Sequence, residues 1–432
     1  MLERSLAQIR LLLLIPIKLP DIITLLIGGV AAFLLAFLLT FFVKAICYKV
    51  GWLDKPAPRR VHTKAVPRLG GVAIYLAFVI ASLFFYTPGP NLNAHANELT
   101  IYWLLIAAGA LLVLVHAYDD ILGLGPWPKL IAQTMAVIII LGPWIDGTFH
   151  GILLFTFNNP FGVDHFNPSL PWYREPTLFL VVRNSDIALA AIPAILLTWF
   201  WTVGMMNTVN WIDGMDGLAT GVVGITALFI TIISFMLNQY SIAVLSAIFT
   251  GAVFGFLPHN WNPAKIFMGD TGSMFLGLAL AVLSIMGGAK LALALMVLGI
   301  PILDVALVIV NRIRRGQSPL HYDKTHLHHR LMAMGLSVKQ ICYLFYGVAI
   351  IFGLLALSFS GVHAAHFYKF VGIVLVVLTM FGLIIWVDYR QRLHGVHIKL
   401  GGPDTPPGGS DEQAPLDSVP ESVPEEPAEH KA

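Results

Sequence analysis

The chain has 432 residues, of which 57% are hydrophobic and 12% are charged, and its mean hydropathy is +0.79. A water-soluble fold of this size would lack the polar surface to cover itself, so the composition predicts a protein that lies in a bilayer. The formal net charge of +2 is too small to indicate a nucleic-acid partner. Neither Cys47 nor Cys342 lies near a second cysteine or a histidine at the spacing of metal ligands, so both are interpreted as packing residues.

About eleven apolar runs have roughly the 20 residues that a membrane-spanning helix needs. This run length excludes a β-barrel, so the predicted fold class is an all-α polytopic membrane protein. We expect the first run to stay in place, because Pro16 and Pro20 precede it and no small-residue cleavage site is present. The runs lie near residues 22–46, 70–87, 101–118, 129–145, 189–207, 217–237, 241–257, 271–287, 290–311, 341–360 and 366–387.

The two ends of the chain are predicted to differ from its middle. From Gly401 onward the sequence is rich in Pro, Gly, Glu, Asp and Ser with almost no bulky apolar residue, which is typical of a disordered segment. We therefore expect an N-terminal extracytoplasmic segment at 1–21, a single transmembrane catalytic domain at 22–390 and a disordered acidic cytoplasmic tail at 391–432.

The basic residues predict the orientation, because cytoplasmic loops carry an excess of Lys and Arg. Basic loops near 54–68 and 312–340 are separated by eight predicted spans and therefore share one face. This places the N-terminus outside and the C-terminus in the cytoplasm. On the outside, apolar and polar residues alternate at 152–157 and 177–182, which indicates a small extracytoplasmic hairpin within 146–188. The basic loops contain Lys55, Arg59, Arg60, Lys64 and Arg68, and Arg312, Arg314, Arg315, Lys324, Arg330 and Lys339.

Every concentrated polar motif falls on the predicted cytoplasmic face. Asp119 and Asp120 directly follow the third span, where two adjacent carboxylates need a metal, a cation or a raised pKa. An interfacial turn or helix cap before Gly123 is the alternative interpretation. We favour a functional pair, because three further acidic sites share this face.

The segment from Asn207 to Gly217 carries four oxygen-bearing side chains at intervals of three residues: Asn207, Asn210, Asp213 and Asp216. This spacing places them on one face of a helix that gives way to glycine turns. Amides and carboxylates suit a hard cation and the hydrogen-bonding edge of a base or sugar. Capping and turn roles would explain one Asn and one Asp, but not easily all four.

Asp270 lies within Phe267–Ser273, at the start of the predicted eighth span and near the positive end of a helix dipole. By itself it would be an ordinary N-cap. Together with the other carboxylates on this face it is a candidate ligand for Mg²⁺, which usually takes one or two protein carboxylates and completes its shell with phosphates and water.

Three histidines and two cations follow the ninth span and form a compact candidate site for phosphate oxygens. Zinc is the alternative ligand, but the segment has no H-E-x-x-H pattern and no nearby cysteine. Asp304 lies inside the ninth span. It is interpreted either as a carboxyl group that takes part in helix packing or as a residue that supports the site. The basic segment contains Lys324, His326, His328, His329 and Arg330.

In their order these motifs resemble the polyprenyl-phosphate N-acetylhexosamine-1-phosphate transferase family, from about Leu53 to Leu331. The resemblance implies ten or eleven spans in a bacterial plasma membrane, with the site on the cytoplasmic face, and it is compatible with a homodimer. Five motifs carry the resemblance: Asp54-Lys-Pro56 through Arg60, His62, Pro67 and Gly70-Gly71; Asp119-Asp120; Asn207–Gly217; Phe267–Ser273; and His326–Leu331.

The resemblance also implies a reaction. The phosphate of an undecaprenyl-phosphate-like lipid attacks the β-phosphate of a UDP-sugar and releases UMP, while Mg²⁺, or alternatively Mn²⁺, neutralises the diphosphate. A single displacement and a covalent aspartyl intermediate both remain open. By this resemblance Asp270 and Asn210 would bind the metal, Asp119 and Asp120 would deprotonate or orient the lipid phosphate, Asn207, Asp213 and Asp216 would face the uridine or sugar, and Lys324, His326, His328, His329 and Arg330 would contact phosphates.

The histidine motif indicates the branch of the family. It looks more like the branch that uses UDP-GlcNAc than the branch that uses UDP-MurNAc-pentapeptide, whose motif is three consecutive histidines, an aromatic residue and an acid; Leu327 and Arg330 depart from that pattern. The pentapeptide transferase remains an alternative, as does a nucleotide-sugar or anion transporter, whose charges should lie near the bilayer midplane. A CDP-alcohol phosphotransferase would need an Arg shortly after its Asp-Gly motif, whereas Asp213-Gly214 is followed here by Asp216-Gly217. An intramembrane hydrolase would need a nucleophile or zinc motif, and the sequence shows neither.

Overall fold

A computed structural model of the chain describes residues 21–54, 65–89, 98–145, 148–154, 156–158, 177–179, 192–286, 290–314, 316, 326–358 and 365–393. The predicted N-terminal segment at 1–21 lies outside these residues except for its last position, and the predicted tail at 391–432 lies outside them except for 391–393. Lys324 and most of the basic residues of the loop near 54–68 are also outside the described residues, whereas Arg68 is within them.

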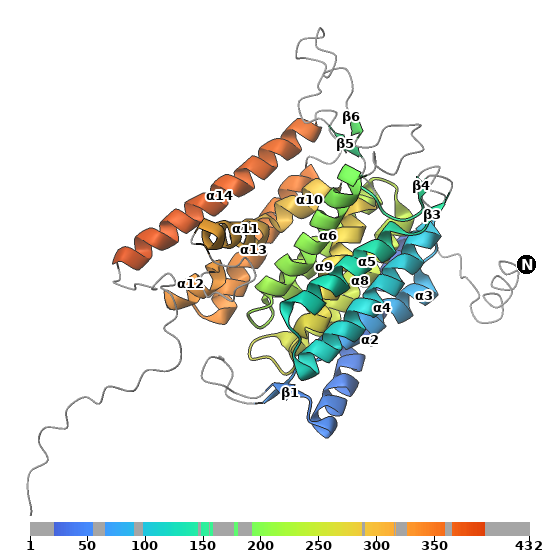
Figure 1. Ribbon diagram of the computed structural model, residues 1–432, viewed down its shortest axis with the longest axis horizontal. Coiled ribbons are helices and arrows are strands. Elements are labelled where there is room, and N and C mark those ends of the chain that lie inside the picture. Colours follow the sequence, from blue (N-terminus) through green and yellow to red (C-terminus); the bar gives the residue numbers. More distant parts are fainter. Residues whose placement is uncertain are drawn as a thin grey trace, which may run out of the picture. The chain divides into compact units, whose positions relative to one another are not determined.

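Thirteen α-helices lie in the described part of the chain (Figure 1). Each predicted span overlaps one helix, or the pair α10–α11, and the bounds differ by a few residues. The helices are α2 (Asp21–Val50), α3 (Gly70–Phe85), α4 (Glu98–Leu122), α5 (Pro126–Leu141), α6 (Ile192–Ile212), α7 (Leu218–Met236), α8 (Tyr240–Asn260), α9 (Gly269–Ile285), α10 (Lys290–Val297), α11 (Gly299–Arg314), α12 (Leu327–Ala333), α13 (Val338–Ser358) and α14 (Ala365–Leu393).

Among the described helices, α2, α4, α6, α7, α8 and α13 are long and apolar enough to cross a bilayer, and the α10–α11 pair would make a seventh span. The other predicted spans correspond to shorter apolar helices: α3, α5, α9 and residues 371–387 of α14. The chain is therefore a mostly helical, polytopic membrane protein.

Helix α9 lies at the centre of the helical bundle. It packs against α3, α4 and α6, and its side chains from Thr271 to Ser284 are buried on all sides. Helix α8 in turn packs closely against α2. A Cβ atom at Gly251 or Gly255 of α8 would collide with the α2 backbone at Gly29 and Phe33, so these small residues allow the two helices to touch.

The outer helices present apolar side chains to their surroundings. Along α2, every fourth residue from 26 to 42 is a large hydrophobic side chain that is more than half exposed. A stripe of this length on a soluble monomer would be an aggregation hazard, whereas in a bilayer it contacts lipid. The residues of the stripe are Leu26, Val30, Leu34, Leu38 and Phe42.

Helices α10 and α11 are two halves of one apolar segment that bends by 75°. Pro301 explains the bend, because a proline has no N–H to donate to the carbonyl of Val297 and its ring clashes with that carbonyl. Backbone bonds resume around it, from Leu298 N to Ala294 O at 2.9 Å and from Ile302 N to Leu298 O at 2.9 Å.

The described strands form three short antiparallel pairs: β1 (Leu53–Asp54) with β2 (Val66–Pro67), β3 (Trp144–Ile145) with β4 (Thr148–Phe149), and β5 (Thr156–Asn158) with β6 (Thr177–Phe179). The β5–β6 pair confirms that the two alternating segments form a hairpin. Figure 1 shows β3 to β6 at the opposite end of the helices from β1. That this end faces the outside of the cell stays a prediction.

Candidate active site

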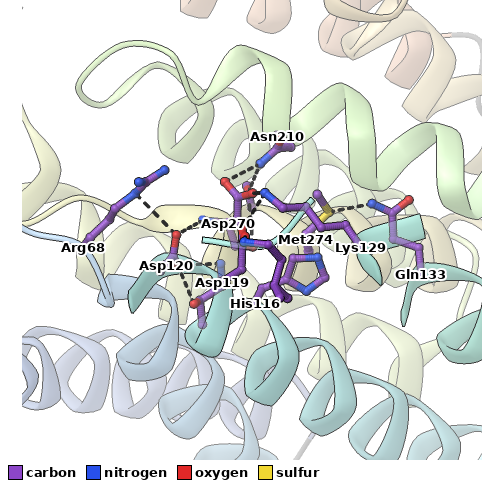
Figure 2. Close-up of polar contacts among 12 residues, drawn as sticks. Arg68, His116, Asp119, Asp120, Lys129, Gln133, Asn210, Asp270 and Met274 are labelled. Carbon is purple, nitrogen blue, oxygen red and sulfur yellow. Dashed lines mark hydrogen bonds and ion pairs between the residues drawn. The ribbon is translucent and has the colours of Figure 1, made fainter. Parts of the chain in front are cut away.

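The acidic motifs meet at one end of the bundle because three helix ends converge there (Figure 2). Asp119 and Asp120 lie in the last turn of α4, and Asp270 is the second residue of α9. Helix α4 ends at Leu122 and is followed by Gly123, whose φ of +76° is a left-handed conformation that favours glycine. Leu124 N then donates to Asp119 Oδ1 at 2.6 Å, and α5 starts at Pro126. This short turn returns the chain to the same end of the bundle.

Asp120 caps the N-terminus of α9 from another helix. Its carboxylate accepts hydrogen bonds from Asp270 N at 3.1 Å, from Thr271 N at 3.0 Å and from Thr271 Oγ1 at 2.6 Å. A carboxylate at this position satisfies backbone N–H groups that the helix leaves unpaired, and it interacts favourably with the helix dipole. The ordinary N-cap role that we considered for Asp270 therefore belongs to Asp120.

The segment before α3 is joined to the segment before α9 by backbone hydrogen bonds. Phe267 N donates to Pro67 O at 2.8 Å, and Gly70 N donates to Phe267 O at 3.0 Å. A Cβ atom at Gly71 would collide with the backbone of Gly272, so the two helix starts can cross only with glycine here. This crossing brings Arg68 to Asp120, with 3.4 Å between Nε and Oδ1.

Lys129 joins the carboxylates of two different helices. Its Nζ lies 2.5 Å from Asp119 Oδ2 and 2.7 Å from Asp270 Oδ2. On the other side of Asp270, Asn210 Nδ2 donates to Oδ1 at 3.0 Å and to Ser273 Oγ at 2.9 Å (Figure 2). Asp270 is thus held by a cation on one oxygen and by an amide on the other.

The carboxylate cluster has the composition and spacing of a divalent-cation site. Ligand oxygens of Asp119, Asp120 and Asp270 all lie within 4.8 Å of one another. Hard carboxylate oxygens of this kind suit Mg²⁺, whose remaining positions are usually filled by phosphates and water. Lys129 balances part of the negative charge of this cluster, and a bound cation would share the same oxygens. The residues present therefore fit such a metal.

A cavity of about 330 Å³ adjoins the cluster on the side of α2. Its walls include the end of α4 with Asp119 and Asp120, the residues Trp52 and Asp54 after α2, and Arg68. Space for a charged group is therefore available directly beside the two carboxylates.

The Asn207–Gly217 segment contributes to three different places. Asn210 reaches the carboxylate cluster, whereas Asn207 is deeper in the bundle, where its Nδ2 donates to Gln133 Oε1 at 2.8 Å. Asp213 lies in the turn after α6. Burial and the nearby carboxylates of Asp270 and Asp120 raise the pKa of Asp213 well above its usual value, because the charged form is disfavoured there.

Asp216 holds a neighbouring loop in place. Its Oδ2 accepts hydrogen bonds from Asn262 Nδ2 at 2.9 Å and from Ala264 N at 3.0 Å. Gly217 is fixed on two sides, because its N–H donates to Asn260 Oδ1 at 3.0 Å and its carbonyl accepts from Tyr346 Oη at 2.5 Å. The turn between α6 and α7 is thereby tied to α8 and to α13.

The histidine motif packs against the same turn. His328 is 2% exposed, and its Nε2 would be 2.9 Å from a Cβ at Gly214. Among the described residues this nitrogen has no hydrogen-bond partner, which is unusual for a buried polar atom. The rings of His326 and Trp211 lie 5.7 Å apart, and those of His328 and His329 lie 4.3 Å apart. Since Trp211 is next to Asn210, the histidine cluster and the carboxylate cluster share one short segment of chain.

Two residues of the site were not found by sequence reasoning. Lys129 lies in the first turn of a helix that otherwise resembles an ordinary membrane span. A lysine at the edge of an apolar run is usually explained as an anchor at the membrane surface. Gln133 lies one turn further along the same helix. Lys129 and Gln133 are two polar residues four positions apart in an apolar helix, and this spacing was the signal that could have identified them. Of the predicted site residues, only Lys324 lies outside the described part of the chain.

Comparison with known proteins gives consistent matches. A family model described as glycosyl transferase family 4 matches residues 102–288. A probable undecaprenyl-phosphate N-acetylglucosaminyl 1-phosphate transferase of Bacillus subtilis is 32% identical over 342 residues, which are 78% of this chain and 85% of the relative. A decaprenyl-phosphate N-acetylglucosaminephosphotransferase of Mycolicibacterium smegmatis is 32% identical over 344 residues, 74% of this chain and 78% of the relative. A phospho-N-acetylmuramoyl-pentapeptide-transferase of Staphylococcus aureus is 31% identical over 304 residues, which are 69% of this chain and 85% of the relative.

Proposed function

Because the chain belongs to glycosyl transferase family 4, we propose that it transfers N-acetylglucosamine 1-phosphate from UDP-GlcNAc to undecaprenyl phosphate and releases UMP. The product is a lipid-linked sugar diphosphate for the synthesis of a cell-envelope polymer. The observation that carries this proposal is the convergence of Asp119, Asp120 and Asp270 with Lys129 beside a buried helix start. The names of the two N-acetylglucosamine relatives support the choice of sugar.

The proposed setting is a bacterial plasma membrane that the chain crosses about eleven times. In this arrangement the N-terminus is outside, the C-terminus is cytoplasmic, and the carboxylate end of the bundle faces the cytoplasm, where nucleotide sugars are found. The basic loop that contains Arg68 supports this orientation, as does the position of the β5–β6 hairpin at the opposite end of the helices (Figure 1).

In the proposed reaction, an oxygen of the lipid phosphate forms a bond to the β-phosphorus of UDP-GlcNAc. The bond between that phosphorus and the oxygen bridging to the α-phosphate breaks, and UMP leaves with the bridging oxygen. Phosphoryl transfer requires mainly positioning and neutralisation of charge. Lys129 and Arg68 supply positive charge beside Asp119 and Asp120, and Asp119 or Asp120 would orient the lipid phosphate and accept its proton.

Asp270 and Asn210 are the proposed holders of Mg²⁺. When bound, the ion would neutralise the diphosphate of the donor. The chain prepares this site itself: Asn210 fixes one oxygen of Asp270 through its amide nitrogen, which leaves the amide oxygen for the cation. Mn²⁺ has the same preference for hard oxygen ligands and is expected to substitute.

The nucleotide and sugar are proposed to lie against the turn between α6 and α7. Burial and the nearby carboxylates raise the pKa of Asp213, which favours its protonated form, and in that form it would donate a hydrogen bond to the donor substrate. Asn207 and Asp216 are proposed to support this side of the site. The proposed phosphate contacts are Lys324, His326, His328, His329 and Arg330.

The decisive experiment measures UMP release by detergent-purified protein with undecaprenyl phosphate, Mg²⁺ and either UDP-GlcNAc or UDP-MurNAc-pentapeptide. We expect release with UDP-GlcNAc alone, and loss of release with EDTA and in Asp270→Ala and Asp119→Ala. Tyr240→Phe is the matched control, because its hydroxyl bonds Asn238 at the other end of α7.

Other results would redirect the proposal. Release with the pentapeptide donor alone would assign the chain to peptidoglycan synthesis. Absence of UMP with both donors, combined with uptake of labelled UDP-sugar into proteoliposomes, would show a transporter instead.

A further inference from the structure

Asp304 is a carboxylate inside an apolar helix, and both of its oxygens accept hydrogen bonds from the histidine motif. Oδ2 lies 2.9 Å from Nδ1 of His326, and Oδ1 accepts from the backbone N–H of Leu327 at 2.9 Å. Asp304 is 7% exposed and His326 is 7% exposed. Asp304 lies in α11, which follows the 75° bend between Val297 and Gly299.

The chemistry of the pair fixes the proton on His326. A carboxylate can only accept, so Nδ1 of the ring must carry the hydrogen in this contact. The other ring nitrogen, Nε2, is then the atom left for a substrate. The same relation between a carboxylate and an imidazole orients histidines in metal sites and in catalytic triads.

The other neighbours of His326 fix the plane of its ring. Trp211 lies 5.7 Å from it, and the ring of His328 lies 5.8 Å away at an interplanar angle of 10°. Trp211 follows Asn210, which is bonded to Asp270. The position of His326 is therefore coupled to the carboxylate cluster through two adjacent residues of α6.

We propose that Asp304 is a positioning residue for phosphoryl transfer: it holds the proton on Nδ1 of His326 and so directs Nε2 to the diphosphate of the nucleotide sugar. This inference rests on the proposed function. It assigns the carboxylate within the ninth predicted span to the site and leaves no need for a separate packing role.

Asp304→Asn tests the proposal with almost no change of shape. The backbone N–H of Leu327 cannot give up its proton, so the amide oxygen of the new side chain must face it. The amide NH₂ then faces Nδ1 of His326, and two donors would meet unless the proton moves to Nε2. The substitution therefore inverts the tautomer of His326 while retaining both hydrogen bonds.

We expect Asp304→Asn to lower kcat for UMP release about 10- to 100-fold, within the range for misplaced proton-carrying groups, with less than about a threefold change in KM for UDP-GlcNAc. In a His326→Gln background the same substitution should have no further effect, because Asp304 acts through that ring. A purely structural role predicts instead that the two losses multiply and that the melting temperature falls.

A second readout does not depend on activity. In protein labelled with ¹⁵N-histidine, the resonances that disappear in His326→Gln identify this ring, and Nδ1 should be protonated in the wild type and unprotonated in Asp304→Asn. Wild-type kcat together with an unchanged tautomer would overturn the inference. A wild-type protein that releases no UMP, but shows the expected tautomers, would overturn the proposed reaction and leave the Asp304–His326 relation in place.

Discussion

The two halves of the site are held in different ways. The carboxylate half is built on the starts and ends of bundle helices, which backbone bonds cross-link at Pro67, Phe267 and Gly70. The histidine half lies on the short helix α12, where the side chains of Asp304 and Trp211 contact His326 and His328 packs against the backbone at Gly214. A rigid half suits the fixed charges that phosphoryl transfer needs, and a half that depends on a few side-chain contacts can adapt to the substrate.

Removing the charge of Lys129 is the sharpest test of the carboxylate half. Lys129→Met leaves Asp119 and Asp270 facing each other without their shared cation, and we expect kcat/KM for UMP release to fall about 10²- to 10³-fold. Lys129→Arg retains the charge and should lose less. Titration with Mg²⁺ adds a second measurement: half-maximal activity should require less Mg²⁺ in Lys129→Met, because Lys129 would compete with the proposed metal for the carboxylate of Asp270. Unchanged activity would show that Lys129 only balances charge at rest.

Sequence reasoning was successful where one continuous segment carries the information. The helices at every predicted span, and the grouping of Asp119 and Asp120 with Asp270, agree with expectations drawn from apolar run length and from the predicted side of each loop. The strand pair within 146–188 follows from alternation. These features depend on local patterns, which the chain displays directly.

Partners that are distant in sequence could not be predicted in the same way. Asp120 caps a helix that starts about 150 residues later, and Asp304 orients a histidine 22 residues further on. Each pair depends on how helices pack, and no local periodicity encodes that. The helix lengths show the same limit, because α3, α5 and α9 are shorter than a full span.

Substitution of Asp216 distinguishes two roles of its carboxylate: contact with the substrate, and support of the loop between α8 and α9. In Asp216→Ala, the Ala264 N–H and the Asn262 amide lose their acceptor, and we expect a loss of about 1–3 kcal/mol of stability with a raised KM for UDP-GlcNAc. Thermal unfolding and steady-state kinetics measure the two effects. If Asp216 only binds substrate, as its motif predicts, activity falls while the melting temperature stays unchanged.

His328 should make the stability of the histidine half dependent on pH. Burial, with repulsion from His329 and His326, lowers the pKa of His328 well below its usual value. The unfolded chain takes up a proton near pH 6.5 that the folded protein does not, so the stabilising contribution is complete above that pH and is lost as the pH falls toward the folded pKa. Between pH 6.5 and 5.5 we expect the wild type to lose about 1 kcal/mol more than His328→Leu. Melting curves of both proteins at the two pH values test this, and parallel losses would contradict it.

The smallest effect is expected at the turn between α6 and α7, where the hydroxyl of Tyr346 holds the carbonyl of Gly217. Tyr346→Phe removes the hydrogen bond to the carbonyl of Gly217 but retains the ring that packs over Gly221 and against Trp261. A hydrogen bond of this kind contributes about 1 kcal/mol, so the melting temperature should fall by a few degrees while kcat changes less than about twofold. Tyr343→Phe, on the same helix and also beside Trp261, is the matched control. A large loss of kcat in Tyr346→Phe alone would mean that the turn must be held rigidly for the reaction, and that the histidine half is no more adaptable than the carboxylate half.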